Sequence, residues 1–177
     1  MLILIVLLPL LGFFSGSLFG RYLGWGTCYI TTGSVFSSLL FSIYLLHDVV
    51  STGVTYKLTM GSWIVVDSLH IDWSFCFDSL TSIMLIVVTF ISTLVHLYST
   101  EYMEFDPHLP RFMSYLSLFT FFMLILITAN NFLQMFVGWE GVGLSSYLLI
   151  NFWFTRIQAN KAAIKACLLY TSDAADD

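Results

Sequence analysis

Charged residues are scarce in this 177-residue sequence, at 10%, whereas hydrophobic residues make up 58% of it. Soluble globular domains carry roughly 25% charged residues, so the composition excludes an ordinary soluble domain. The mean hydropathy of +0.89 indicates an integral membrane protein whose surroundings are the lipid bilayer. Lysine and arginine together number only 6, and they form no basic patch. We therefore expect no nucleic-acid partner.

Cysteine is equally sparse. The three cysteines, Cys28, Cys76 and Cys167, show no CxxC pattern and no Cys/His spacing of a metal site. The sequence therefore supports neither a disulfide framework nor a metal centre. Acidic residues exceed basic ones, but Asp173, Asp176 and Asp177 lie at the very end of the chain. The body of the chain is nearly neutral.

What the sequence does contain is long apolar runs. A span needs to cross a hydrocarbon core of about 30 Å at about 1.5 Å per residue. Five runs are long enough, and they cover residues 1–20, 27–46, 79–98, 112–129 and 132–154. The first has no cationic start and no small-residue cleavage site, so we interpret it as a true span rather than a signal peptide.

Two segments between these runs read as loops. Residues 99–111 hold two prolines and three acids, which predicts an aqueous loop. Residues 155–166 carry three cations and predict a loop that leads into a sixth helix. The expected fold is an all-α polytopic membrane protein with about five transmembrane helices and the start of a sixth.

One segment has the alternation of a β-hairpin. Residues 69–77 alternate apolar and mainly polar side chains, and residues 63–66 are β-branched and aromatic, with Asp67 and Ser68 between them as the turn. Strand edges exposed in lipid would lack hydrogen-bond partners. We therefore expect the hairpin on the membrane surface, between the second and third spans, with its apolar face packed on the helices.

The cations predict the orientation in the membrane. With five spans, one side holds all of them but one: Arg21, Arg111, Arg156, Lys161 and Lys165. Only Lys57 falls on the other side. The positive-inside rule makes the first side the cytoplasmic or matrix side, so the N-terminus and the hairpin face outward.

Glu140 is the first candidate functional residue, because it interrupts the apolar segment 138–154. A carboxylate at hydrocarbon depth costs roughly 2.5–3.5 kcal/mol on insertion scales, and such acids often mark ion routes. At about 100° per residue, Glu140, Tyr147 and Asn151 form a polar line on one helix face. Glu140 is either a proton-carrying carboxylate that a neighbouring cation can switch or a neutral structural acid bonded to another helix.

The residues around Glu140 have simpler interpretations. Gly138, Gly141 and Gly143 predict a close helix contact, and this segment contains neither a GxxxG pattern nor a phosphate-binding loop. His96 ends a polar stripe on the third span, which also contains Ser82, Thr89, Ser92 and Thr93. His96 is either a hydrogen-bonded packing residue or a proton relay. Asp78 is expected to cap the third span.

The last eleven residues, CLLYTSDAADD, fit none of these patterns. They resemble a translated transposase-type sequencing adaptor, so we expect residues 167–177 to be a non-native tail. We also expect the natural protein to continue beyond residue 166.

Residues 78–128, which begin DSLTSIMLIVVTF, and residues 130–166, which contain NNFLQMFVGWEGVGLSSYLL, resemble the family of NADH dehydrogenase subunit 5, an antiporter-like subunit of respiratory complex I. Residues 1–77 resemble it more loosely. The resemblance makes residues 1–166 the N-terminal part of an antiporter-like membrane domain. It places the family's key acid at Glu140. The polar line on the fifth span and the polar stripe on the third, which come from the residues themselves, make His96, Tyr147 and Asn151 the candidate proton path.

The same resemblance implies the setting. The chain would translocate protons within NADH:ubiquinone oxidoreductase and would hold no cofactor of its own, while NADH, flavin, iron–sulfur clusters and ubiquinone bind elsewhere in the complex. Its partners would be other membrane subunits and lipid. Its location would be the mitochondrial inner membrane, or alternatively a bacterial plasma membrane. The family's relay lysines come later than residue 166, so we expect the isolated chain to be inactive.

Two other functions remain open. The chain could belong to a cation/proton antiporter outside complex I, which shares the same chemistry. It could also be a purely structural or non-functional membrane fragment.

Overall fold

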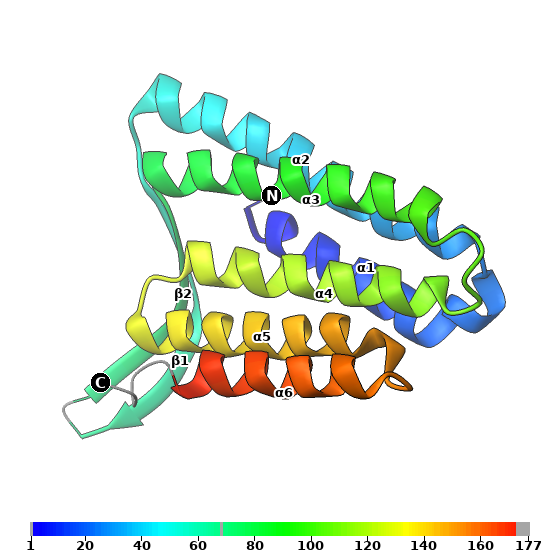
Figure 1. The fold of residues 1–177 in the computed structure, drawn as a ribbon. Helices are drawn as coiled ribbons and strands as arrows, with labels where there is room; N and C mark the ends of the chain where they lie inside the picture. The colour runs from blue at the N-terminus through cyan, green and yellow to red at the C-terminus, as the bar shows by residue number, and fades with distance from the viewer. Residues whose placement is uncertain (1, 68, 173–177) are drawn as a thin grey trace.

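The computed structural model describes residues 2–67 and 69–172 and shows a bundle of long helices with one β-hairpin (Figure 1). The helices are α1 (Leu2–Leu23), α2 (Gly26–Thr52), α3 (Ser79–Tyr102), α4 (Leu109–Thr128), α5 (Phe132–Ile150) and α6 (Ile157–Ser172), and a short 3-10 helix, η1 (Asn151–Trp153), follows α5. The hairpin consists of β1 (Tyr56–Val66) and β2 (Leu69–Phe77). The predicted all-α membrane fold is confirmed.

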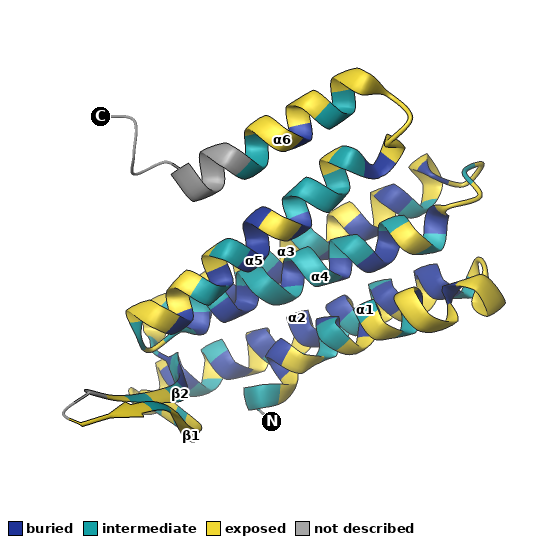
Figure 2. Cartoon of the chain, turned by 90° about the horizontal axis from the view of Figure 1, so that it is seen from below, coloured by how far each residue is buried: buried dark blue, intermediate teal, exposed yellow. Residues whose placement is uncertain are grey.

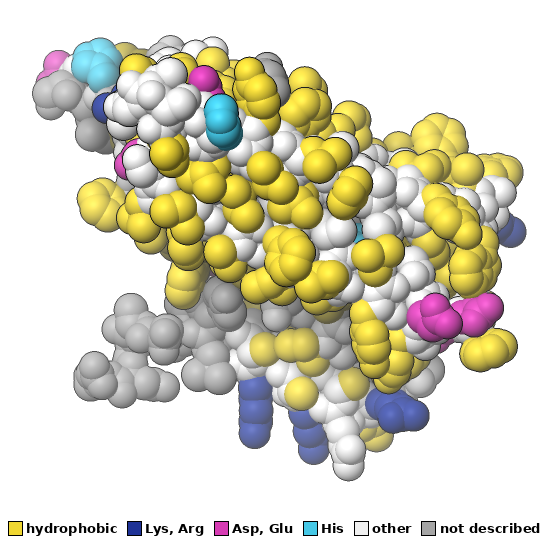
Figure 3. Space-filling view, turned by 90° about the horizontal axis from the view of Figure 1, so that it is seen from above, with side chains coloured by type: hydrophobic (Ala, Val, Ile, Leu, Met, Phe, Trp, Pro, Cys, Tyr) yellow, Lys and Arg dark blue, Asp and Glu magenta, His cyan; other side chains and the backbone are white. Residues whose placement is uncertain are grey.

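Helix α4 lies at the centre of the bundle, where it contacts α1, α2, α3 and α5. Helix α6 packs against α5 and η1 at the outside. Buried side chains face the contacts between helices, whereas the outward faces are exposed (Figure 2). Figure 3 shows one such outward face, covered largely by hydrophobic side chains with charged ones toward its rim. An apolar exterior of this kind suits a lipid environment.

Four helices, α1 to α4, are long and apolar enough to cross a membrane. The predicted fifth span coincides with α5, which has 19 residues. It is not among these four candidate spans, and it contains Gln134, Glu140 and three glycines. Its membrane crossing stays a prediction that rests on its length and on its place beside α4.

The predicted hairpin is present, and its strands pair antiparallel. β1 begins at Tyr56, seven positions before the expected start at residue 63. The register shifts between Thr59 and Gly61 and again between Ser62 and Ile64. An extra residue at a bulge breaks the alternation of side chains. The first half of β1 therefore lacks the period-two pattern from which the strand could have been predicted. Ser68 of the predicted turn lies outside the described residues.

The hairpin is clamped to the helices by its second strand. Phe75 and Phe77 are buried in the main apolar cluster with residues of α1, α2 and α4. The Ser74 N–H donates to Oε1 of Gln134 at 3.1 Å. Asn131 at the α4–α5 turn donates through Nδ2 to the Asp72 carbonyl at 2.7 Å. The expected packing of the hairpin's apolar face on the helices is confirmed.

Both loops are shorter than predicted, because the neighbouring helices extend into them. Residues 99–111 were expected to be loop, but α3 continues to Tyr102 and α4 begins at Leu109. Pro110 stands in the first turn of α4, where its missing N–H costs nothing because first-turn N–H groups have no helical acceptor. Residues 155–166 are also mostly helical, since α6 begins at Ile157. The predicted helix 132–154 ends earlier, as α5 stops at Ile150 and η1 follows.

A GxxxGxxxG pattern in α1, which the sequence analysis did not single out, forms a main packing contact. Its glycines, Gly12, Gly16 and Gly20, are all buried. A Cβ on Gly16 would lie 2.8 Å from the Ser114 Cβ, and one on Gly20 would lie 2.8 Å from the Pro110 Cβ. The absence of side chains therefore lets α1 approach α4 closely.

Candidate functional site

Glu140 stands near the middle of α5. Eight residues separate it from the start of the helix at Phe132, or about 12 Å at 1.5 Å per residue. The side chain is half-buried. Within residues 2–67 and 69–172, its carboxylate makes no hydrogen bond and no ion pair. In this part of the chain, only its place on α5 fixes the position of the acid.

The glycines on either side of Glu140 set the direction in which it points. A Cβ on Gly138 would lie 2.7 Å from the Leu126 Cα, and one on Gly141 would collide with the Phe122 ring. The predicted close contact at these glycines is thus confirmed, and it is made with α4. Because successive residues are about 100° apart, Glu140 lies on the side of α5 turned away from α4.

Tyr147 and Asn151 follow Glu140 on this side, and both are half-buried. α5 remains regular as far as Ile150, so Tyr147 keeps the predicted register, whereas Asn151 falls in η1. No hydrogen bond joins the three side chains in the described part of the chain. Oδ1 of Asn151 is buried and has no partner there.

His96 lies in a different interface, fully buried between α3 and α4. Its Nδ1 is 2.7 Å from the Ser92 carbonyl oxygen, and its Nε2 is 3.2 Å from Oγ of Ser117. A carbonyl only accepts, so we assign the proton to Nδ1, and Nε2 then accepts from Ser117. Ser92 extends the network through its Oγ, which is 2.5 Å from Oγ1 of Thr120.

Only part of the predicted polar stripe belongs to this network. Thr89 and Thr93 donate to carbonyls of their own helix, and Ser82 donates to the Asp78 carbonyl. Ser92 and His96 are the members whose hydrogen bonds reach α4. Their partners there, Ser117 and Thr120, were missed by the sequence analysis. The signal that could have found them is the spacing of Ser114, Ser117 and Thr120 at every third residue of an apolar helix.

A second missed residue is Gln134, which is fully buried in the first turn of α5. Its Oε1 accepts the Ser74 N–H, while its Nε2 has no partner in the part of the chain that the structure describes. Gln134 therefore ties the start of α5 to strand β2. The structure does not bring His96 and Glu140 together, since they face different helix contacts.

Two titratable groups outside the spans are perturbed. Burial, reinforced by a hydrogen bond to Asp78, raises the pKa of the Cys76 thiol. The Cys76 Sγ lies 3.1 Å from Oδ1 of Asp78. The hydrogen bond from the Tyr56 hydroxyl to Asp48, at 2.7 Å, raises the pKa of Tyr56. Asp78 precedes α3 as predicted, but the expected cap is wrong, because its side chain forms no cap hydrogen bond.

Three of the cations lie at or near one groove, while the predicted side of the membrane stays a prediction. Arg21 and Arg111 line one groove at the end of the bundle. Nε1 of Trp153 lies 3.4 Å from Oδ2 of Asp106, another residue of that groove, and the Arg156 guanidinium stacks over the Trp153 ring. Lys161 and Lys165 lie exposed on α6, the predicted sixth helix, which begins at Ile157.

No three His, Cys, Asp or Glu side chains among residues 2–67 and 69–172 come close enough to hold a metal ion. Glu140 and His96 remain the candidate proton-carrying groups.

Comparison with known proteins gives two family matches. Residues 63–113 match the family described as NADH-ubiquinone oxidoreductase (complex I), chain 5 N-terminus. Residues 129–173 match the family described as NADH:quinone oxidoreductase/Mrp antiporter, TM. The second match overlaps the first residues of the expected non-native tail, so the boundary at residue 166 stays a prediction.

The chain is also similar to curated proteins named NADH-ubiquinone oxidoreductase chain 5. It is 58% identical over 170 residues to that of Phytophthora infestans, and the aligned region covers 96% of this chain and 26% of the relative. It is 57% identical to that of Arabidopsis thaliana and 54% identical to that of Metridium senile, each over 170 residues and 96% of this chain, and 25% and 28% of the relatives. The chain thus spans about a quarter of these relatives' length.

Proposed function

The chain belongs to the family of NADH-ubiquinone oxidoreductase chain 5, and from this premise we propose that it serves as part of a proton-translocating membrane subunit of complex I. Two family matches and the high identity over nearly the whole chain support the proposal. The single structural observation that carries it is Glu140, an acid about 12 Å along a helix and without a partner in the described chain.

The chemistry follows from that position. An ionised carboxylate inside a bilayer is costly, so its charge responds strongly to a nearby cation. When a cation approaches, Glu140 releases its proton, and when the cation withdraws, Glu140 takes up a proton. Because Glu140 points away from α4, the cation would come from the opposite side of α5.

His96, Tyr147 and Asn151 are the proposed path residues. Tyr147 and Asn151 support a route along the Glu140 side of α5. The buried Oδ1 of Asn151, which has no partner in the described chain, can accept a hydrogen bond from a proton-carrying group. His96 supports a second segment, because its two ring nitrogens connect Ser92 to Ser117. A neutral imidazole bonded at both nitrogens can pass a proton when one bond is exchanged.

The setting is proposed on the same premise. The other membrane subunits of complex I and the surrounding lipid are the partners. NADH, flavin, iron–sulfur clusters and ubiquinone bind in other subunits. The location is the mitochondrial inner membrane, with the N-terminus and hairpin on the outer side and the cationic end of the bundle, with Arg21 and Arg111, on the matrix side.

A cation/proton antiporter is the second candidate function, because the description of the second family match includes Mrp antiporters. The test uses closed vesicles that contain the complete subunit in its native complex. Adding NADH should acidify the vesicle lumen in step with NADH oxidation. Sodium efflux that needs no NADH would instead identify an antiporter and overturn the complex I proposal.

The domain boundary is also a proposal. We propose that residues 1–166 form the antiporter-like unit and that residues 167–177 are non-native. Sequencing the genomic DNA across the codon for Ala166 tests this, because a reading frame with a different continuation supports the boundary. A genomic match to CLLYTSDAADD would contradict it.

A further inference from the structure

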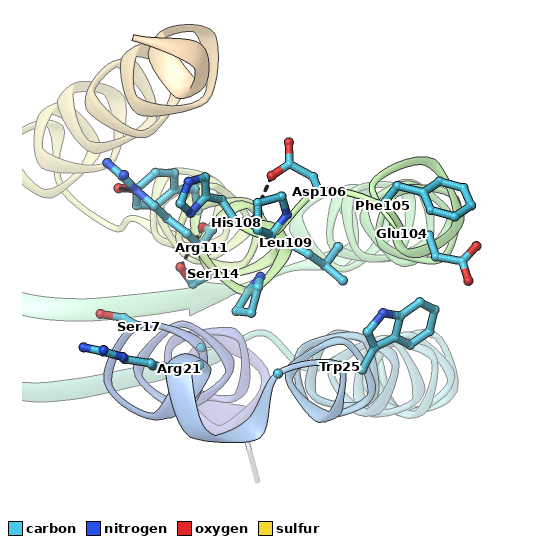
Figure 4. A pocket seen from close by; sticks show the side chains of 16 residues that line it. Ser17, Arg21, Trp25, Glu104, Phe105, Asp106, His108, Leu109, Arg111 and Ser114 are labelled. Carbon is cyan, nitrogen blue, oxygen red and sulfur yellow. Dashed lines mark hydrogen bonds between the residues drawn. The ribbon is translucent and has the colours of Figure 1, made fainter. Parts of the chain in front are cut away.

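A groove opens at one end of the bundle, between the end of α1 and the start of α4 (Figure 4). Its volume is about 870 Å³, and the α1–α2 turn and the α3–α4 loop complete its walls. Neither Glu140 nor His96 lines it. The groove is therefore separate from both candidate proton-carrying groups.

Helix packing creates this opening. Gly16 and Gly20 form its α1 wall, and a Cβ on Gly20 would lie 2.8 Å from the Pro110 Cβ on α4. α1 thus contributes no side chain to this contact, and the Pro110 side chain of α4 packs against the α1 backbone. The rim carries Arg21 on α1 and Arg111 on α4.

The rim is cationic on one flank. Figure 4 shows Arg21 and Arg111 on the same flank of the groove, with the Ser17 side chain between them in this view. No carboxylate in the described part of the chain pairs with either arginine. Glu104 lies on the other flank, whereas Asp106 lies between the two flanks in this view, beside His108. Asp106 already accepts the His108 N–H at 2.8 Å.

Arg111 is held in a fixed orientation. Its Nε donates to the Tyr115 hydroxyl at 2.8 Å, and its guanidinium lies 5.5 Å from the centre of the Tyr115 ring. The two terminal nitrogens remain for an anion. A planar guanidinium with two parallel N–H groups matches the geometry of phosphate oxygens, so the site suits a phosphate group.

The surface beside the arginines indicates where that phosphate comes from. An exposed apolar stripe runs along α1 from the rim at helical spacing, and its members are Leu11, Phe14, Leu18 and Tyr22. Both α1 and α4 are candidate membrane spans, so the rim lies at the membrane interface. A soluble phosphate has no apolar part that could contact the stripe, whereas the acyl chains of a phospholipid would cover it.

We propose that this groove binds the headgroup phosphate of an anionic phospholipid, with Arg21 and Arg111 as its cationic partners and Ser17 as a hydroxyl donor. The acyl chains lie along the apolar stripe of α1. The site anchors the contact between α1 and α4 to the bilayer and does not depend on proton transport.

The test is native mass spectrometry of the complete chain purified in a neutral detergent. Dioctanoyl phosphatidylglycerol, dioctanoyl phosphatidylcholine and inorganic phosphate are the probes. We expect phosphatidylglycerol to bind with one high-affinity copy and phosphatidylcholine to bind more weakly. Arg21→Gln and Arg111→Gln should each weaken phosphatidylglycerol binding about fivefold, as expected for one basic residue beside an anionic headgroup.

Arg156→Gln is the matched control, because Arg156 lies at the same end of the bundle but does not line the groove. It should leave the affinity unchanged. Ser17→Glu, at an exposed position, keeps the proposal testable if an arginine variant fails to fold, and it should weaken binding by repelling the phosphate. Equal binding of both lipids, an equal loss in Arg156→Gln, or displacement of the lipid by equimolar inorganic phosphate would overturn the proposal.

Discussion

At the residue scale, Gly138 decides how closely α5 approaches α4. A Cβ there would lie 2.7 Å from the Leu126 Cα and 2.8 Å from its N, which are backbone atoms that cannot rotate away. We expect Gly138→Ala to destabilise the chain by about 1–3 kcal/mol, the usual cost of overpacking. Thermal unfolding of the detergent-solubilised chain measures this change.

Gly33→Ala is the matched control for that variant. Gly33 is also helical, and nothing lies within 4 Å of its added Cβ. Alanine favours a helix over glycine by up to about 1 kcal/mol, so this variant should be neutral or slightly more stable. Equal effects of the two variants would show that helix propensity, and not the contact with Leu126, governs Gly138.

Cys76 tests the electrostatics of the hairpin edge. Burial and the Asp78 hydrogen bond raise the pKa of its thiol, so at pH 8 less of it is the reactive thiolate than in an ordinary cysteine. Asp78→Asn removes the carboxylate and should lower the pKa of Cys76, which speeds alkylation by iodoacetamide a few-fold at pH 8. Peptide mass spectrometry measures the rate at this residue.

Asp72→Asn serves as the control for Asp78, since Asp72 is an exposed acid on the same strand. The rate of Cys76 alkylation in Asp72→Asn should match the rate in the unchanged chain. Alkylation of Cys76 in Asp78→Asn that is no faster at pH 8 than in the unchanged chain would rule out the proposed effect on the thiol pKa.

At the scale of the elements, Gln134 joins the hairpin to α5. Gln134→Leu leaves the Ser74 N–H without its acceptor, which costs about 1–3 kcal/mol for a buried donor. Part of this cost is offset because the unpartnered Nε2 disappears as well. We expect faster hydrogen exchange across β2, whereas Gln158→Leu, at an exposed position of α6, should leave that exchange unchanged. Unaltered protection of β2 in Gln134→Leu would mean that Phe75 and Phe77 alone hold the strand.

Sequence periodicity predicted the long helices and the second strand because each has one repeating apolar pattern. The ends of the helices were harder to predict from the sequence. Pro110, for example, looks like a helix breaker but is tolerated in the first turn of α4. The bulges of β1 removed its alternation. At the site, the depth of Glu140 and the glycine contact followed from local spacing. The His96 partners did not, because Ser117 and Thr120 lie on another helix.

At the scale of the whole molecule, the single span α3 separates the hairpin from the α3–α4 loop and so places them on opposite sides of the membrane. Thr59→Cys in β1 and Glu104→Cys in the loop, both exposed positions, report on this. A membrane-impermeant maleimide added to the outer face should label Thr59→Cys and leave Glu104→Cys unlabelled until the membrane is opened. Labelling of both from one side would contradict the arrangement.

The central claim is that Glu140 carries protons, and the number of protons moved per NADH oxidised tests it most directly. The measurement uses closed vesicles with the complete subunit assembled in its complex and compares Glu140→Gln with Glu104→Gln, a loop acid outside the helices. Glu140→Gln should lower the ratio while NADH oxidation and assembly persist, Glu140→Asp should restore part of it, and Glu104→Gln should leave it unchanged. An unchanged ratio in Glu140→Gln would contradict the claim.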